Sequence, residues 1–121
     1  MATKKILVIE DEPVLRKNIL AILQFEDYEV FEAEDGMVGI ELARTHLPDL
    51  ILCDIRMPHL DGYEVLAALR DDQQTATIPV VFTTAKANKQ DIEHGIELGV
   101  NAYLTKPFQI ADLLSVIQNQ F

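Results

Sequence analysis

The chain has 121 residues, of which 20 are Asp or Glu and 10 are Lys or Arg, so its formal net charge is −10. An acidic surface repels phosphate backbones and anionic lipids, and the scattered basic residues form no patch, so nucleic acids and membranes are disfavoured as partners. Hydrophobic residues make up 49% of the chain, which suits an ordinary folded core and excludes a disordered protein.

The length is typical of one domain, and we expect residues 1–121 to form it. The single cysteine, Cys53, cannot form an intramolecular disulfide, which is consistent with a reducing compartment. The apolar run after the charged N-terminus is too short for a signal peptide, and no stretch approaches the roughly 18 apolar residues of a membrane span. We therefore expect a cytoplasmic protein.

Five short apolar runs alternate with five segments of helical periodicity. The runs suggest strands, mostly of the kind buried on both faces of a parallel sheet, and cover residues 6–9, 28–33, 50–53, 80–82 and 102–104. Apolar residues three or four apart predict helices around residues 15–23, 38–43, 65–69, 92–96 and 110–117. This alternation predicts an α/β fold with a doubly wound, five-stranded parallel sheet.

Several residues mark the ends of these helices. Pro13 is expected in the first turn of the first helix, and Asp35 at the N-cap of the second. Asp61, with Glu64 three residues later, predicts a capping box at the start of the third helix. Gly99 marks the end of the fourth helix.

Charged and hydroxyl side chains directly follow the predicted strands. Doubly wound sheets bind ligands at the carboxyl ends of their strands, where the strand order reverses. Of the orders such sheets adopt, 2-1-3-4-5 places Asp54 at the centre, between the acids after the first strand and the later hydroxyls and lysine. The candidates are Glu10, Asp11 and Glu12 after the first strand, Asp54 after the third, Thr83 and Thr84 after the fourth, and Thr105 and Lys106 after the fifth.

The chemistry of this set predicts a magnesium and phosphoryl site. Two carboxylates about 4 Å apart repel by about 4 kcal/mol at an effective dielectric of about 20, so a cation is expected among them. A few oxygen ligands that leave room for water and phosphate oxygens suit Mg²⁺. Lys106 supplies a second positive charge, and Asp54 is placed to accept a phosphoryl group as an aspartyl-phosphate.

Five motifs in this order resemble the receiver domain of bacterial two-component response regulators. They are Glu10-Asp11, Asp54-Ile55-Arg56-Met57-Pro58, Asp61-Gly62, Thr84-Ala85 and Lys106-Pro107-Phe108. Each motif alone is weak, but the five together at strand ends are specific, and the resemblance covers essentially the whole chain. It implies a flavodoxin-like receiver fold with strand order 2-1-3-4-5 and a function in phosphorelay signalling.

The resemblance also implies residue roles in phosphoryl transfer and switching. Asp54 would accept the phosphoryl group, Lys106 would hold one of its oxygens, and Thr84 would swing its hydroxyl onto another. Tyr103 would be the switch aromatic, turning inward when Thr84 moves. The Lys106-Pro107 peptide bond is expected to be cis. Such a domain catalyses its own phosphorylation and dephosphorylation and is not a turnover enzyme.

The metal site implied by the resemblance uses Asp11, Asp54 and the backbone carbonyl of Arg56 as ligands of Mg²⁺, with Glu10 holding a metal-bound water. Many relatives carry Asp at the position of Glu10. The longer Glu side chain can still bind the ion through water, so the difference affects only how directly this carboxylate binds it. Two long cations, Arg56 and Lys86, lie two residues after Asp54 and Thr84 respectively. We hypothesise that they shield the acyl phosphate from water.

Partners also follow from the resemblance. A sensor histidine kinase or phosphotransfer protein would dock near the first helix and the loop after the fifth strand. The fourth helix, fifth strand and fifth helix would form the switched surface for a downstream protein target or a fused output domain, and a phosphorylation-dependent homodimer is compatible with it. The last helix ends near residue 121, so the chain is either a stand-alone regulator or the receiver of a longer protein.

Three other functions compete with this interpretation. A degenerate receiver would bind proteins without being phosphorylated, which the intact set of site residues disfavours. A phosphatase of the haloacid dehalogenase type would need a second Asp where Arg56 stands. A flavin binder would need a loop rich in Ser, Thr and Gly after the first strand, where Glu10, Asp11 and Glu12 stand instead.

Structural roles compete residue by residue. Asp11 and Glu12 could simply cap the first helix without binding a metal. Thr84 could be an N-cap, and Lys106-Pro107 could be a solvated helix start. Tyr103 could be a core aromatic. Cys53 is expected to be a small buried strand residue, and the histidines, which show no metal-binding spacing, are expected at the surface; they are His46, His59 and His94.

Overall fold

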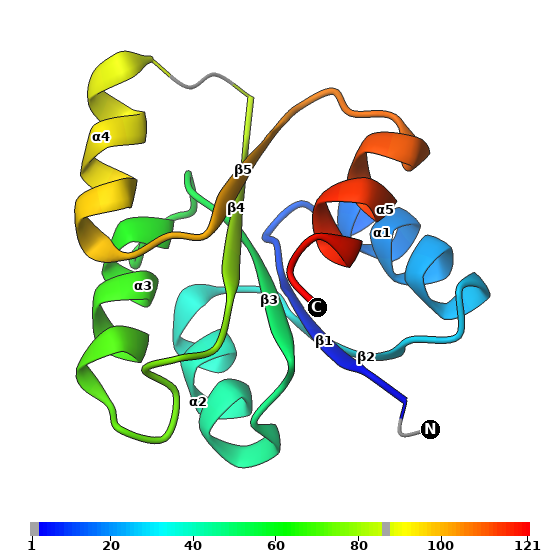
Figure 1. The fold of residues 1–121 in the computed structure, drawn as a ribbon, viewed down its shortest axis with the longest axis horizontal. Helices are drawn as coiled ribbons and strands as arrows, with labels where there is room; N and C mark the ends of the chain where they lie inside the picture. The colour runs from blue at the N-terminus through cyan, green and yellow to red at the C-terminus, as the bar shows by residue number, and fades with distance from the viewer. Residues whose placement is uncertain (1–2, 86–87) are drawn as a thin grey trace.

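The computed structural model describes residues 3–85 and 88–121, in which strands and helices alternate along the chain (Figure 1). The elements are β1 (Lys5–Ile9), α1 (Pro13–Phe25), β2 (Glu29–Ala33), α2 (Gly36–His46), β3 (Leu50–Asp54), α3 (Gly62–Asp71), β4 (Val80–Thr84), α4 (Lys89–Leu98), β5 (Ala102–Thr105) and α5 (Ile110–Gln118). The predicted alternation of strands and helices is confirmed.

The sheet is parallel, with the strand order β2-β1-β3-β4-β5, as predicted. Helices α1 and α5 cover one face, and α2, α3 and α4 cover the other (Figure 1). The order reverses between β1 and β3, so the polar residues after these two strands lie at the switch point. None of the described helices is long and apolar enough to cross a bilayer.

The helix ends follow the predicted signals. Pro13 is the first residue of α1, and Asp35 caps α2 by accepting a hydrogen bond from the Val38 amide at 2.9 Å. Asp61 and Glu64 form a reciprocal capping box at the start of α3. Gly99 ends α4 with a φ of 92°, in the left-handed region that a glycine adopts without strain.

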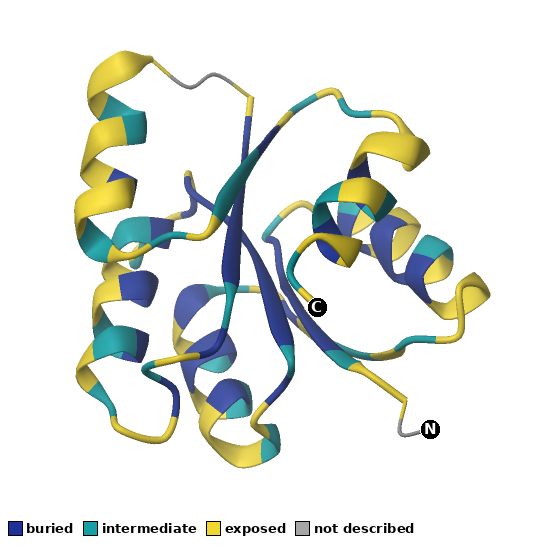
Figure 2. Cartoon of the chain, in the orientation of Figure 1, coloured by how far each residue is buried: buried dark blue, intermediate teal, exposed yellow. Residues whose placement is uncertain are grey.

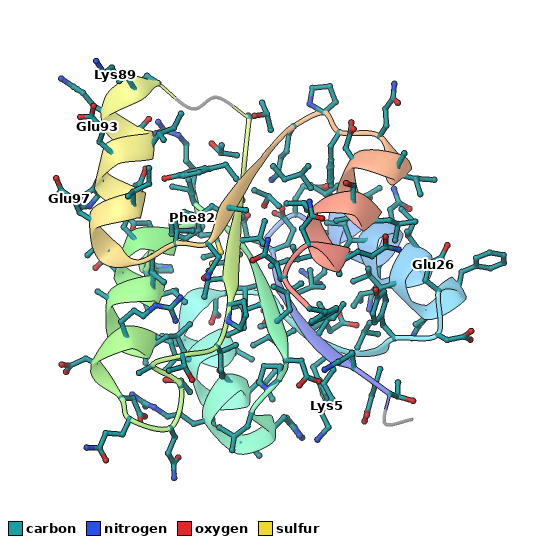
Figure 3. The ribbon with its side chains drawn as sticks, in the orientation of Figure 1. Lys5, Glu26, Phe82, Lys89, Glu93 and Glu97 are labelled. Carbon is teal, nitrogen blue, oxygen red and sulfur yellow. The ribbon has the colours of Figure 1, made fainter. Side chains whose placement is uncertain are left out.

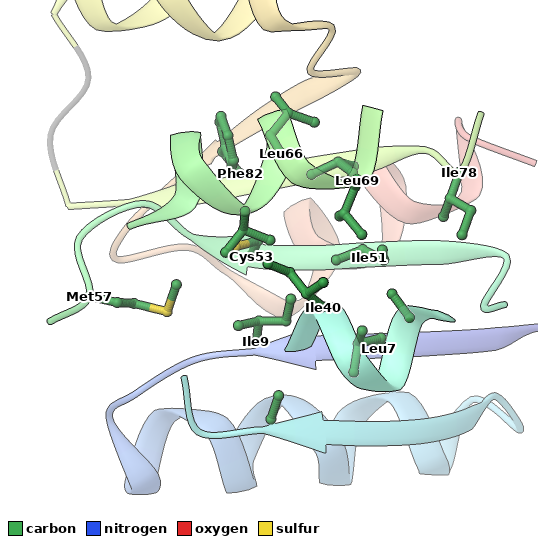
Figure 4. Packing of buried hydrophobic residues seen from close by; sticks show 14 of the residues in the cluster. Leu7, Ile9, Ile40, Ile51, Cys53, Met57, Leu66, Leu69, Ile78 and Phe82 are labelled. Carbon is green, nitrogen blue, oxygen red and sulfur yellow. The ribbon is translucent and has the colours of Figure 1, made fainter. Parts of the chain in front are cut away.

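Apolar side chains fill a layer on each side of the sheet. Strand β1 alternates between them: Leu7 and Ile9 pack with α2 and α3, whereas Ile6 and Val8 pack with α1 and α5. Figure 4 shows the first layer, which includes Cys53. All five residues of β3 and of β4 are buried (Figure 2). The central strands are therefore fixed, and the residues at their carboxyl ends are held on a rigid support.

Cys53 is fully buried in β3, as predicted. His59 and His94 are exposed, also as predicted. His46 is partly covered because its ring stacks on Phe31, with 4.2 Å between ring centroids.

Candidate functional site

Polar residues from four strand ends converge at the carboxyl edge of the sheet. Asp54 and Thr84 are the last residues of β3 and β4, so β3 extends one residue and β4 two residues beyond the strand ends expected from the sequence. Glu10 follows β1, and Lys106 follows β5. Strand pairing extends to the functional residues, so the backbone of Asp54 and of Thr84 is fixed by the sheet.

Three carboxylates form a compact acidic cluster. Glu10, Asp11 and Asp54 each offer one oxygen, and these oxygens lie within 4.8 Å of one another. Glu10 is 1% exposed and Asp54 is 6% exposed, while Asp11 is half-buried. Three oxygen donors this close, two of them removed from water, have the chemistry that a hard divalent cation such as Mg²⁺ requires.

Lys106 supplies the positive charge in this cluster. Its Nζ lies 2.7 Å from Oε1 of Glu10 and 3.3 Å from Oδ1 of Asp54. The Lys106-Pro107 peptide bond is cis, as predicted. The alternative of a solvated helix start is wrong, because α5 begins only at Ile110 and the Lys106 side chain points into the acidic cluster.

The two partners of this ion pair have perturbed ionisation. Burial raises the pKa of Asp54 to about 6, the charge of Glu10 adds to the rise, and Lys106 opposes it. Burial lowers the pKa of Lys106, but its hydrogen bond to Glu10 and the charge of Asp54 outweigh this, so the pKa is raised. Lys106 therefore remains a cation, and Asp54 loses its proton as the pH rises through about 6 rather than through about 4.

Asp11 and Glu12 divide the two roles that the sequence left open. Glu12 caps α1: its carboxylate accepts hydrogen bonds from the amides of Val14 and Leu15 at 3.1 and 2.7 Å. Its own amide donates to Oε2 of Glu10 at 3.0 Å. Asp11 belongs to the acidic cluster. Glu12 is therefore the residue that caps α1, whereas the Asp11 carboxylate lies beside that of Asp54 in the acidic cluster.

Thr84 is 1% exposed and, at the end of β4, lines a hollow of about 460 Å³ together with Asp61 and Asp91. The alternative of an N-cap is wrong, because Asn88 caps α4 by accepting a hydrogen bond from the Asp91 amide at 2.8 Å. Arg56 lines the same hollow from the loop between β3 and α3 and is exposed. Lys86, the second cation of the shielding hypothesis, lies outside the described residues.

Tyr103 is half-buried, and its hydroxyl donates a hydrogen bond to the carbonyl of Asp91 in α4 at 2.9 Å. Its ring packs edge-on against Phe82, which lies on the side of β4 that faces α4 (Figure 3). The ring therefore packs as a core aromatic does, and its hydroxyl contacts α4.

Sequence reasoning missed two residues around Tyr103. The hydroxyl of Tyr63 in α3 donates to the same Asp91 carbonyl at 3.3 Å. Gly95 in α4 leaves the space that the Tyr103 hydroxyl occupies. A lone aromatic and a lone helical glycine carry no pattern in sequence, although a glycine inside a helix is unfavourable by about 1 kcal/mol and so hints at a packing constraint.

A family model for the response regulator receiver domain matches residues 6–118. The polar-differentiation response regulator DivK of Brucella ovis is 35% identical over 97% of this chain and 95% of DivK. The DNA-binding dual master transcriptional regulator RpaA of Synechocystis is 39% identical over 94% of this chain. The match covers 47% of RpaA, so the chain spans about half the length of that relative.

A solved structure extends the comparison to the site. The receiver domain of the sensor histidine kinase PA1611 from Pseudomonas aeruginosa superimposes with a TM-score of 0.90 at 35% identity, covering 98% of each chain. That structure holds a magnesium ion coordinated in its active site cleft.

Proposed function

Because this chain belongs to the response regulator receiver domain family, which serves two-component phosphorelay signalling, we propose that it accepts a phosphoryl group on Asp54. The donor is a sensor histidine kinase or a phosphotransfer protein. The observation that carries the proposal is the position of Asp54, a buried carboxylate that lies close to the acids after β1 and to the Lys106 ammonium group.

Phosphoryl transfer requires three things of these residues. A carboxylate oxygen of Asp54 forms a bond to phosphorus as the bond to the donor's histidine nitrogen breaks, and that nitrogen keeps the electron pair. Lys106 neutralises charge on a phosphoryl oxygen, and the Thr84 hydroxyl donates to another. Burial excludes bulk water from Asp54, which strengthens these interactions.

Mg²⁺ is the cofactor that the acidic cluster fits. Glu10, Asp11 and Asp54 bring three oxygens together, and we propose the backbone carbonyl of Arg56 as a further ligand. When bound, the ion supplies positive charge to the phosphoryl oxygens. The magnesium in the similar PA1611 receiver supports this assignment.

Phosphorylation then changes a surface. The new negative charge draws the Thr84 hydroxyl toward the phosphoryl group and lets Tyr103 respond, which alters α4, β5 and α5 for a downstream protein. We propose a cytoplasmic protein whose residues 1–121 form one receiver and whose output is a separate target, a fused domain or a phosphorylation-dependent homodimer. Its own acidic chain disfavours nucleic acid and membranes as direct partners.

Mass spectrometry after incubation with MgCl₂ and a small phosphodonor tests the function. We expect a mass gain of one phosphate in the wild type and none in Asp54→Asn. A wild type that gains no phosphate would indicate a degenerate receiver. Sustained release of phosphate in many-fold excess over protein would indicate a phosphatase, against our proposal that the chain is not a turnover enzyme.

Arg56→Ala is expected to lose phosphate from Asp54 up to about fivefold faster, since an exposed charge contact is worth up to about 1 kcal/mol. The exposed Arg56 side chain, two residues after Asp54, lines the same hollow as Thr84, where it can hold water away from the acyl phosphate. The decay of the phosphorylated protein measures this rate. Arg44→Ala is the matched control, because Arg44 pairs with Asp72 away from the site. Unchanged or slower decay in Arg56→Ala would contradict the shielding role.

A further inference from the structure

Arg16 is a buried cation in α1 that the proposed mechanism does not use. It is 9% exposed, although arginine is rarely buried without a specific partner. Its Nη1 donates to the backbone carbonyl of Glu10 at 2.8 Å, and its Nε donates to Oε1 of Glu32 in β2 at 3.1 Å. The guanidinium thus bridges the edge of the sheet and the acidic loop after β1.

These contacts complete the fixation of Glu10. Its amide donates to the carbonyl of Ala33 at 3.0 Å, so β2 holds one side of the Glu10 backbone and Arg16 holds the other. Its carboxylate is held as well, by the Glu12 amide and by Lys106. With the Glu10 carbonyl fixed, the chain leaves β1 in a set direction and places Asp11 beside Asp54.

The ion pair with Glu32 does not by itself explain why a buried arginine occupies position 16. Lys17, the next residue, contacts the same Glu32 carboxylate at 2.8 and 2.9 Å, and its side chain is 63% exposed. The described contacts of Lys17 are with Glu32 alone, away from the acidic loop. What distinguishes Arg16 is its contact with the Glu10 carbonyl, in a buried position that brings a positive charge behind the acidic cluster.

We propose that Arg16 is a positioning residue for the magnesium site, fixing the loop of Glu10 and Asp11 so that their carboxylates meet Asp54 in the arrangement that the ion needs. The inference rests on the proposed function, because it assigns Arg16 to the same metal site. Arg16 acts through Glu10. Residues that orient metal ligands typically change metal affinity by about 10- to 100-fold when they are replaced.

Two variants and two matched controls test this assignment. Arg16→Met removes both hydrogen bonds, and Arg16→Lys keeps the charge but loses the two-armed geometry of the guanidinium. Lys17→Met removes only the exposed pair with Glu32. Thr75 lies in the loop between α3 and β4, before the amino end of β4, and its hydroxyl donates a buried hydrogen bond of 2.7 Å to the Leu69 carbonyl. Thr75→Val removes this bond and so destabilises the fold without touching the site.

The measurements are the dissociation constant of Mg²⁺, from amide NMR shifts during titration with MgCl₂, and the phosphorylation rate by a small phosphodonor at several MgCl₂ concentrations. For Arg16→Met we expect a dissociation constant about tenfold higher, with the half-saturating MgCl₂ concentration rising in parallel and the rate at saturation changing less. Arg16→Lys should lie between Arg16→Met and the wild type. Both controls should stay close to the wild type, because Lys17 contacts Glu32 and Thr75 contacts the Leu69 carbonyl, neither of which belongs to the acidic cluster.

The outcomes separate this inference from the proposed function. If the wild type binds Mg²⁺ and is phosphorylated on Asp54, but Arg16→Met has the wild-type dissociation constant, only the positioning role is overturned. A loss in Thr75→Val equal to that in Arg16→Met would also overturn it, since general destabilisation would explain both. If the wild type neither binds Mg²⁺ nor gains phosphate, the proposed function fails and the inference fails with it.

Discussion

Asp54→Asn is expected to stabilise the protein in Mg²⁺-free buffer at pH 7 by about 2 to 3 kcal/mol. The pKa of Asp54 is raised from 3.8 to about 6, first by burial and then by the charge of Glu10. The folded state therefore disfavours the ionised carboxylate, and the protein loses stability as the pH rises from about 4 to above 6. Asparagine has no charge to bury, so the variant avoids this loss.

Urea denaturation of both proteins between pH 4 and 7.5 measures the difference in the free energy of unfolding. We expect the difference between the two curves to shrink as the pH falls toward 4, because the carboxyl group of Asp54 is by then protonated in the folded state and becomes increasingly protonated in the unfolded state. Asp71→Asn, at the exposed end of α3, controls for the loss of one negative charge from an acidic chain. A wild type that is as stable as Asp54→Asn at pH 7 would contradict the prediction.

Added Mg²⁺ should reduce this advantage of Asp54→Asn over the wild type. An ion that binds the folded state stabilises it in proportion to the logarithm of its concentration over the dissociation constant. The wild type offers three carboxylates and Asp54→Asn offers two, so added MgCl₂ should stabilise the wild type more. The charge that costs stability without the ion is thus the charge that binds it, which is the usual conflict between stability and function at an active site.

The sequence predicts this fold well because the pattern and the topology agree. Branched apolar runs between amphipathic segments leave few arrangements other than a doubly wound sheet. The acidic cluster was predictable too, since parallel strands bring their carboxyl ends together whatever the details of packing. Only the strand ends were misplaced: Asp54 and Thr84 are paired in the sheet, because polar residues end the apolar pattern before the backbone pairing ends.

Contacts between residues far apart in the chain were not predictable. The sequence offered Glu10 as a ligand of metal-bound water, but its direct pairing with Lys106 over 96 positions depends on how two loops approach one another. No sequence pattern singles out Arg16, and only its burial and its hydrogen bond to the Glu10 carbonyl show that it contacts the acidic loop. The roles of Tyr63 in α3 and Gly95 in α4 depend on Tyr103 in β5, whose hydroxyl shares the Asp91 carbonyl with Tyr63 and occupies the space above Gly95.

Gly95→Ala is expected to destabilise the protein by about 1 to 2 kcal/mol, the net of a steric loss of about 1 to 3 kcal/mol and a gain in helix propensity of up to about 1 kcal/mol. A methyl group on Gly95 would overlap the Tyr103 hydroxyl and lie 3.0 Å from the ring carbon that bears it. Tyr103 would have to leave its position and lose the hydrogen bond to the Asp91 carbonyl. The variant should therefore hold Tyr103 outward, whether or not Asp54 is phosphorylated.

A double-mutant cycle with Tyr103→Phe isolates this contact. Phenylalanine keeps the ring against Phe82 but removes the oxygen that the new methyl group would meet first, so it should cost about 1 kcal/mol alone. In the double variant the methyl group has room, and the total loss should fall short of the sum of the single losses by about 1 kcal/mol. Strictly additive losses in urea denaturation would show that the Tyr103 hydroxyl does not occupy the space above Gly95 in solution.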